Sequence, residues 1–155
     1  MSVKTRIVTA TLSAALGVAG AVVVYYEGKE NRAYRDPVGI VTICYGHTAT
    51  ARLGQTHTDE ECDRLLQADL GDAFNAVDDA VIVELPVERR AALASFVYNV
   101  GEGAFRNSTL LRKLNAGDTA GACKELDRWV HAGGKVLPGL VKRRATEREL
   151  CEVGL

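Results

Sequence analysis

The sequence predicts an α+β fold in which helices dominate and one small sheet lies close to the N-terminal end. Most of the chain after residue 58 carries apolar residues at helical spacing. The run Ile40–Tyr45 instead has the β-branched and apolar character of a short strand. A chain of 155 residues is long enough for one domain, or for two small lobes that share a core. Helices and a small sheet on one such core define the α+β class.

The overall charge argues against a nucleic-acid partner. The formal net charge is −1, so the chain has no basic field that would attract a polyanion. The hydrophobic fraction of 47% is ordinary for a globular domain and is raised slightly by the first 26 residues. We expect a monomer.

The N-terminal segment differs from the rest of the chain. Lys4 and Arg6 precede twenty uncharged residues, Ile7 to Tyr26, which is about the length that a helix needs to cross a bilayer core. Eight of the twenty are Ile, Val or Leu and ten are Ala, Gly, Ser or Thr, so insertion into a membrane would be weak. The two cations favour keeping this end in the cytoplasm, which would export the remainder.

Three interpretations of this segment compete. In the first, it is a cleaved signal peptide, with Ala19–Ala21 as the small-residue cleavage site. In the second, it is a permanent anchor. In the third, it is a weak anchor that enters the membrane and later leaves it. A buried helix of a soluble protein is disfavoured, because the twenty positions contain no polar face.

Capping signals define the helices that follow. Thr58 and Glu61 form a capping box, and apolar residues recur at helical spacing after it as far as Val77. Pro86 suits the first turn of the next helix, which is apolar nearly all round and ends at Gly101. That helix should therefore be central and buried.

Three further helices complete the chain. Ser108 can cap a short helix that closes at Gly117, and Asp118 can cap the next. The last helix begins near Pro138 and runs to about Cys151.

Two carboxylates and a hydroxyl lie between residues 27 and 48. Glu27 ends the apolar segment, Asp36 follows nine positions on, and Thr42 lies in the predicted strand. Hydrolysis of a glycosidic bond needs such groups. One acid protonates the leaving oxygen, a second group activates water or stabilises the developing positive charge, and a hydroxyl can orient the water. Most carboxylate pairs at this spacing are solvated surface charges, so the pair needs support from a wider pattern.

That wider pattern resembles the active-site stretch of the bacteriophage lysozyme family of muramidases and endolysins. The family pattern of Glu, eight residues, Asp, five residues and Thr is matched at Glu27, Asp36 and Thr42. The resemblance covers essentially everything after residue 26, with one departure at Cys44, where the family usually has Gly. Its other matching segments are Ala33–Tyr34, Tyr45–Thr48, Phe96–Gly101, Phe105–Ser108 and Arg143–Arg148.

The resemblance implies a small N-terminal β-containing lobe and a larger helical lobe, joined by a long helix. It implies hydrolysis of the β-1,4 bond between N-acetylmuramic acid and N-acetylglucosamine in peptidoglycan, with inversion and without cofactor or metal. Glu27 would be the general acid. Asp36 would stay ionised to activate water or stabilise the oxocarbenium-like state, and Thr42 would help to place that water.

Three more positions match family residues close to the substrate cleft. Tyr98, Asn99 and Ser108 are therefore candidate sugar contacts. Helix packing for Tyr98 and helix capping for Ser108 are the structural alternatives.

The resemblance also favours the weak-anchor interpretation, because some endolysins with such an N-terminus are called signal-anchor-release endolysins. It predicts an anchor over residues 1–26, which tethers the protein to the inner membrane through residues 7–26 and later becomes the first helix of the enzyme. Residues 27–155 would form the catalytic domain. The tethered form would be silent because its cleft is incomplete, and release into the periplasm would start lysis of the bacterial host.

Two other functions remain open. A lytic transglycosylase would cut the same bond with one Glu and no water, which leaves Asp36 and Thr42 unexplained. A membrane-tethered wall-binding module without catalysis would make the acidic pair incidental.

Four cysteines in an exported domain suggest two disulfides, for which three pairings exist. Cys123 and Cys151 fall on the last two long helices, which favours a bond between them and leaves Cys44 for Cys62. A zinc site at Cys44 and His47 is the rival interpretation, but no second ligand pair of that kind follows.

For His47 and for a charged cluster near the C-terminus, we expect structural rather than catalytic roles. We expect His47 to be a buried hydrogen-bonding residue rather than the proton donor. We expect a solvated helix face where acidic and basic residues interleave near the C-terminus, at Lys142, Arg143, Arg144, Glu147, Arg148 and Glu149.

Overall fold

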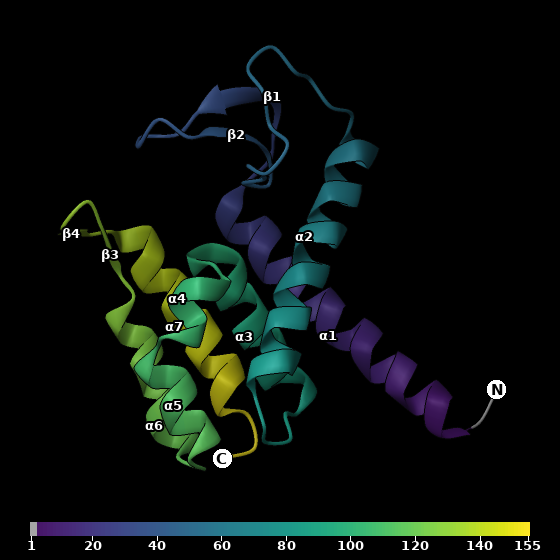
Figure 1. Cartoon of the computed structure of the whole chain (residues 1–155), viewed down its shortest axis with the longest axis vertical. Helices are drawn as coiled ribbons and strands as arrows, with labels where there is room; N and C mark the ends of the chain where they lie inside the picture. The colour runs from purple at the N-terminus through teal and green to yellow at the C-terminus, as the bar shows by residue number, and fades with distance from the viewer. Residues whose placement is uncertain (1–2) are drawn as a thin grey trace.

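Two lobes meet at a long helix (Figure 1). The computed structural model describes the backbone of residues 3–155 and the side chains from residue 13 on. The small lobe contains the hairpin of β1 (Glu30–Arg35) and β2 (Val41–Cys44), and α2 (Asp59–Ala80) leads from it to the helical lobe. This is the α+β arrangement that the sequence predicted. The other elements are α1 (Val3–Glu27), α3 (Val87–Val100), α4 (Glu102–Arg106), α5 (Thr109–Asn115), α6 (Thr119–Glu125), η1 (Leu126–Arg128), β3 (His131–Ala132), β4 (Lys135–Val136) and α7 (Pro138–Glu152).

The small lobe is built on the antiparallel β1–β2 pair. In this pair Tyr34 lies opposite Thr42, and the register shifts by a bulge between Glu30 and Tyr34. The carboxyl of Asp36 shapes the connecting turn, since its Oδ1 accepts hydrogen bonds from the backbone N–H groups of Val38 (3.0 Å) and Ile40 (2.8 Å). The hairpin therefore fixes Asp36 at the end of β1.

Helix α2 begins at the predicted capping box. Thr58 accepts from the backbone N–H of Glu61, and the Glu61 carboxylate accepts from the N–H of Thr58. A disulfide between Cys44 and Cys62 attaches β2 to the first turn of this helix. Cys44 has φ +60° and is the one non-glycine residue with positive φ in the described part of the chain, which explains why the family usually has Gly there.

Helix α3 is the centre of the helical lobe, as its apolar sequence predicted. It packs against α1, α2 and α7, and its residues Ala91–Val97 are all buried. Ser108 and Asp118 cap α5 and α6 as expected. The second disulfide, Cys123–Cys151, attaches α6 to α7, so the structure contains both pairings that the positions of the cysteines favoured.

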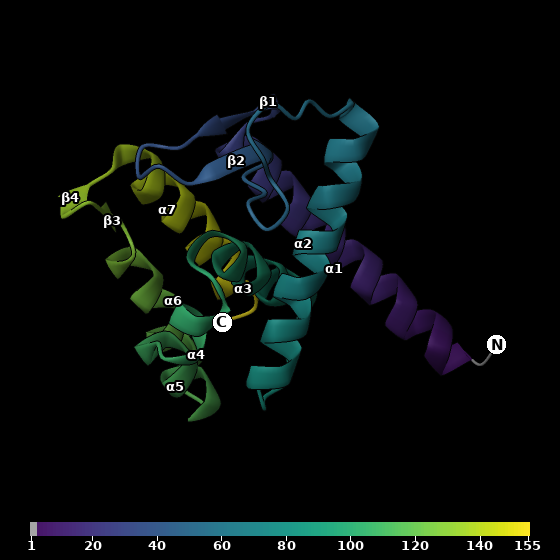
Figure 2. The same cartoon turned by 45° about the horizontal axis from the view of Figure 1, so that its top comes forward.

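Helix α1 brings Glu27 to the junction of the lobes. Its residues Ala15, Ala19, Val22 and Val23 are buried in the common core. Its first turns extend beyond the other elements in both views (Figures 1 and 2). Within the described part of the chain, no helix has the length and apolar character that crossing a membrane requires. The predicted anchor over residues 7–26 falls partly outside the described side chains, which begin at residue 13.

Candidate active site

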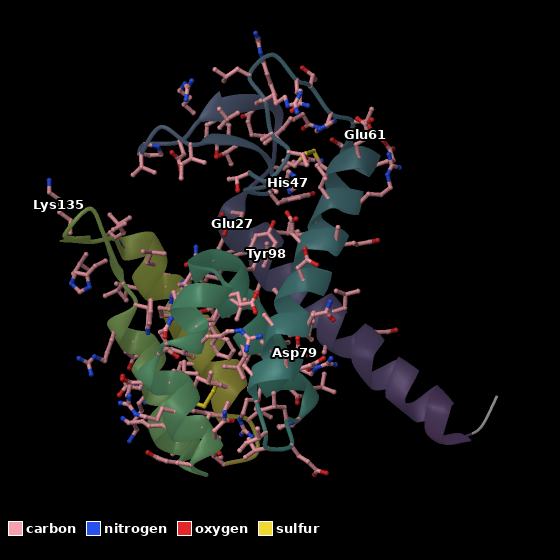
Figure 3. All side chains as sticks on the ribbon, in the orientation of Figure 1. Glu27, His47, Glu61, Asp79, Tyr98 and Lys135 are labelled. Carbon is pink, nitrogen blue, oxygen red and sulfur yellow. A yellow bond between two sulfur atoms is a disulfide. The ribbon has the colours of Figure 1, made fainter. Side chains whose placement is uncertain are left out.

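The last residue of α1, Glu27, lies where the two lobes meet, close to His47 and Tyr98 (Figure 3). Its side chain is 22% exposed. Gly46, which follows β2, has φ +86°, and a β-carbon added there would lie 3.2 Å from Oε2 of Glu27. A glycine at this position therefore combines a left-handed backbone with close approach to the carboxyl.

Arg143 of α7 holds the other oxygen of Glu27. Its Nη1 donates a 2.5 Å hydrogen bond to Oε1 of Glu27. The same guanidinium donates from Nε to Glu147 Oε1 (3.1 Å) and from Nη2 to the carbonyl of Ser95 (3.2 Å). Because only 3% of the Arg143 side chain is exposed, its position is fixed by these partners.

The expectation of a solvated face on this helix was wrong for Arg143, Arg144 and Glu147, which are all buried. Glu147 accepts from the Ser95 hydroxyl at 2.7 Å and from Arg144 as well. Burial raises the pKa of the Glu147 carboxyl, and the guanidiniums of Arg144 and Arg143 oppose that rise. The partners of this network come from distant segments, Glu27 of α1 and Ser95 of α3, which the charge pattern of α7 alone does not reveal. Lys142 and Glu149 do face solvent.

The hairpin contributes the other two predicted residues. Asp36 is partly exposed at the end of β1, with Oδ1 held by the turn. Thr42 is buried in β2, where its hydroxyl donates to the carbonyl of Ile40 at 3.1 Å. Both side chains are thus positioned by the backbone of one hairpin.

Each of the two carboxyls has one oxygen held and one free. Oε1 of Glu27 is bonded to Arg143 and Oδ1 of Asp36 to two backbone N–H groups. Among the described residues, Oε2 of Glu27 and Oδ2 of Asp36 have no hydrogen-bond partner within the protein. These two oxygens therefore keep their hydrogen-bonding capacity for a group from outside the protein.

Tyr34 lies in the electrostatic field of several carboxylates. Burial raises the pKa of its phenol, and the negative charges of Glu27, Asp36 and Glu30 add to the rise in that order. The phenol therefore stays protonated. In the sequence Tyr34 was only one matching position of the resemblance, and no chemical signal distinguished it.

Two cavities flank Glu27. One of about 690 Å³ is lined by the end of α1, by β1 and by Cys44, and includes Glu27 and Tyr34. The other, of about 240 Å³, lies among the loop after β2 and helices α2, α3 and α4, and includes Gly46 and Tyr98. Gly46 of the smaller cavity lies close to the carboxyl of Glu27, which lines the larger one.

The three candidate sugar contacts have structural partners. The hydroxyl of Tyr98 donates to the carbonyl of Tyr45 at 2.6 Å, and burial raises its pKa. Asn99 accepts through Oδ1 from Arg144. Ser108 is buried and caps α5 by accepting from the N–H of Leu111 at 3.0 Å. Tyr98 lines the smaller of the two cavities beside Glu27, whereas Ser108 lines a separate one of about 500 Å³ beside Trp129.

His47 is a buried hydrogen-bonding residue, as expected. Its Nδ1 lies 2.7 Å from the carboxylate of Asp69 on α2, and its Nε2 lies 2.8 Å from the hydroxyl of Thr50. The ring thereby ties the loop after β2 to the helix that joins the lobes.

Several known proteins are similar to this chain in sequence or in fold. A SAR-endolysin of Bacteriophage PS119 is 49% identical over 126 residues, which cover 81% of this chain and 75% of that protein. A SAR-endolysin of Enterobacteria phage P21 is 48% identical over 126 residues, covering 81% and 76%. The solved muramidase domain of SpmX from Asticaccaulis excentricus superposes with a TM-score of 0.80 at 36% identity, over 86% of this chain and 94% of that one. The profile of the family described as Phage lysozyme matches residues 24–147, and the chain therefore belongs to the phage lysozyme family.

Proposed function

We propose that this phage-type lysozyme hydrolyses the β-1,4 bond between N-acetylmuramic acid and N-acetylglucosamine in peptidoglycan and so lyses the host cell. The chain is a glycoside hydrolase by family, and a muramidase domain is among its structural neighbours. The assignment of the site rests on the carboxyls of Glu27 and Asp36, which share one pattern of hydrogen bonding. In each, one oxygen is held by hydrogen bonds from the protein, and the other has no hydrogen-bond partner among the described residues.

The proposed mechanism divides the work between the two lobes. Glu27, the general acid, delivers a proton from Oε2 to the leaving glycosidic oxygen. Asp36 uses Oδ2 to activate water or to stabilise positive charge on the sugar, and Thr42 helps to place that water. Attack by water on the face opposite the leaving group inverts the anomeric centre. The reaction needs no cofactor.

Single substitutions test these roles. Glu27→Gln should remove nearly all turnover, because the amide has no proton of suitable acidity, and should change thermal stability little. Asp36→Asn should also reduce kcat strongly. Glu60→Gln is the matched control, because Glu60 is exposed in the first turn of α2 and should keep full activity. Retention of most turnover in Glu27→Gln would show that the role assignment is wrong.

We also propose that residues 7–26 tether the protein to the inner membrane before release, so that residues 1–26 act as the anchor and residues 27–155 as the catalytic domain. Two relatives that are 49% and 48% identical over 126 residues are named SAR-endolysins, which supports this proposal. The end of α1 would then have two roles: it would first lie in the lipid bilayer and would later pack in the core of the enzyme. While α1 lies in lipid, Glu27 is separated from Arg143. The released enzyme would act as a monomer in the periplasm.

The exposed small residues of α1 allow a sharp test of the tether. Ala14, Gly17 and Ala21 face away from the core, so replacing all three with Leu raises membrane affinity without disturbing packing. This variant should stay in the membrane fraction and fail to lyse cells, whereas replacement of the same residues with Ser should preserve lysis. Normal lysis by the Leu variant would contradict the proposal.

A further inference from the structure

Tyr34 is an aromatic residue without a structural partner at the reaction centre. It is 42% exposed. Within the described residues its ring makes no contact with another ring and its hydroxyl has no hydrogen-bond partner in the protein. Single exposed apolar residues are common on protein surfaces, so exposure alone assigns no role to Tyr34. The role is inferred from the location of the ring.

The register of the hairpin places Tyr34 beside Thr42. The two residues are direct cross-strand partners in the β1–β2 pair. Side chains at such positions lie on the same face of the sheet, with β-carbons about 4.5–5.5 Å apart. The ring therefore stands next to the hydroxyl that is proposed to place the water.

The cavity that contains Glu27 gives the ring a second neighbour. Tyr34 is the only aromatic residue among the described residues that line this space of about 690 Å³. Glu27 lines the same space, so the ring and the Glu27 carboxyl border one cavity. A sugar bound in this space beside Glu27 would lie next to the ring.

We propose that Tyr34 is a substrate-positioning residue whose ring stacks on the pyranose next to the scissile bond and holds it against Glu27 and Thr42. This inference rests on the proposed function of the site. A pyranose presents a face of C–H groups, and the electron-rich face of an aromatic ring is a large, rigid surface for such groups. Stacking fixes the height and tilt of the sugar, which leaves the two carboxyls free for chemistry.

Kinetics of the full-length chain on purified peptidoglycan test the inference. Tyr34→Ala should raise KM about tenfold with little change in kcat, because it removes binding that substrate and transition state share. Tyr34→Phe and Tyr34→Trp should keep KM within about threefold of the original value, because either ring can stack. Leu53→Ala is the control, since Leu53 is 54% exposed in the same lobe and lies outside both cavities beside Glu27.

Three results would overturn the inference. An unchanged KM in Tyr34→Ala would show that the ring does not bind sugar, and a KM for Tyr34→Phe as high as that of Tyr34→Ala would assign the effect to the hydroxyl. A loss of kcat and thermal stability at constant KM would indicate a merely structural role and would also overturn it. Failure of the proposed function is distinguishable, because the unaltered chain and Leu53→Ala would then both release no sugar ends.

Discussion

Arg143 donates a 2.5 Å hydrogen bond to the carboxyl of Glu27, although 116 residues separate the two in the sequence. The contact joins α7, the last helix, to the C-terminal end of α1. Arg143 is itself held by Glu147 and Ser95. The orientation of Glu27, the proposed general acid, therefore depends on a buried network of α3 and α7 that reaches it through Arg143.

Replacing Arg143 with Lys should lower kcat about tenfold to a hundredfold with a small change in KM. Lysine keeps the charge but lacks the planar fork that reaches Glu27 and Glu147 together, so the Glu27 carboxyl would shift. Arg148→Lys on the same helix is the control, because Arg148 pairs with Asp127 and Glu152 near the surface. Steady-state kinetics of the two variants would decide, and equal kcat values would refute a positioning role for Arg143.

The left-handed backbone at Cys44 predicts a difference between two disulfide-free variants. Cys44→Gly with Cys62→Ala and Cys44→Ala with Cys62→Ala both lose the bond, at a cost of about 2–4 kcal/mol in free energy of unfolding. The Gly variant should nevertheless be more stable than the Ala variant by about 1 kcal/mol, because φ +60° is unfavourable for Ala. Urea unfolding measures both values, and equal stability of the two variants would contradict the expected strain.

The ion pair between Lys113 and Glu125 predicts a pH-dependent contribution to stability. Lys113 Nζ donates to Glu125 Oε1 at 2.6 Å, and this hydrogen bond lowers the pKa of the Glu125 carboxyl. A lowered folded-state pKa stabilises the protein above the unfolded-state pKa of about 4.3, and the gain is lost as pH falls through the folded-state value. Lys113→Met should therefore lower Tm at pH 7, and its Tm should converge with that of the unaltered chain once the pH has fallen below the folded-state pKa of Glu125. A Tm difference that does not shrink in acid would exclude the ion pair as its cause.

Local signals in the sequence predicted most of the helical framework. Thr58 with Glu61, Ser108 and Asp118 each announced a helix start that the structure contains. Capping depends on residues three positions apart, so a single sequence carries the information. The resemblance supplied the lobes and the catalytic pattern.

Long-range partners were beyond the reach of the sequence. Strand β1 (Glu30–Arg35) is largely polar and forms because β2 pairs with it, so no β-type run announced it. The two-residue strands β3 and β4 are too short to show a period. Arg143 and Glu147 looked like members of a solvated face, because their partners in α1 and α3 are remote in sequence.

Digestion of purified peptidoglycan by the full-length chain, followed by mass analysis of the new sugar ends, tests the central claim most directly. Hydrolysis predicts reducing N-acetylmuramic acid ends that each carry one added water, and predicts their absence with Glu27→Gln. Anhydro ends would contradict the account by showing a transglycosylase, for which Asp36 has no role. Absence of new ends from the unaltered chain would contradict it as well and would indicate a wall-binding module.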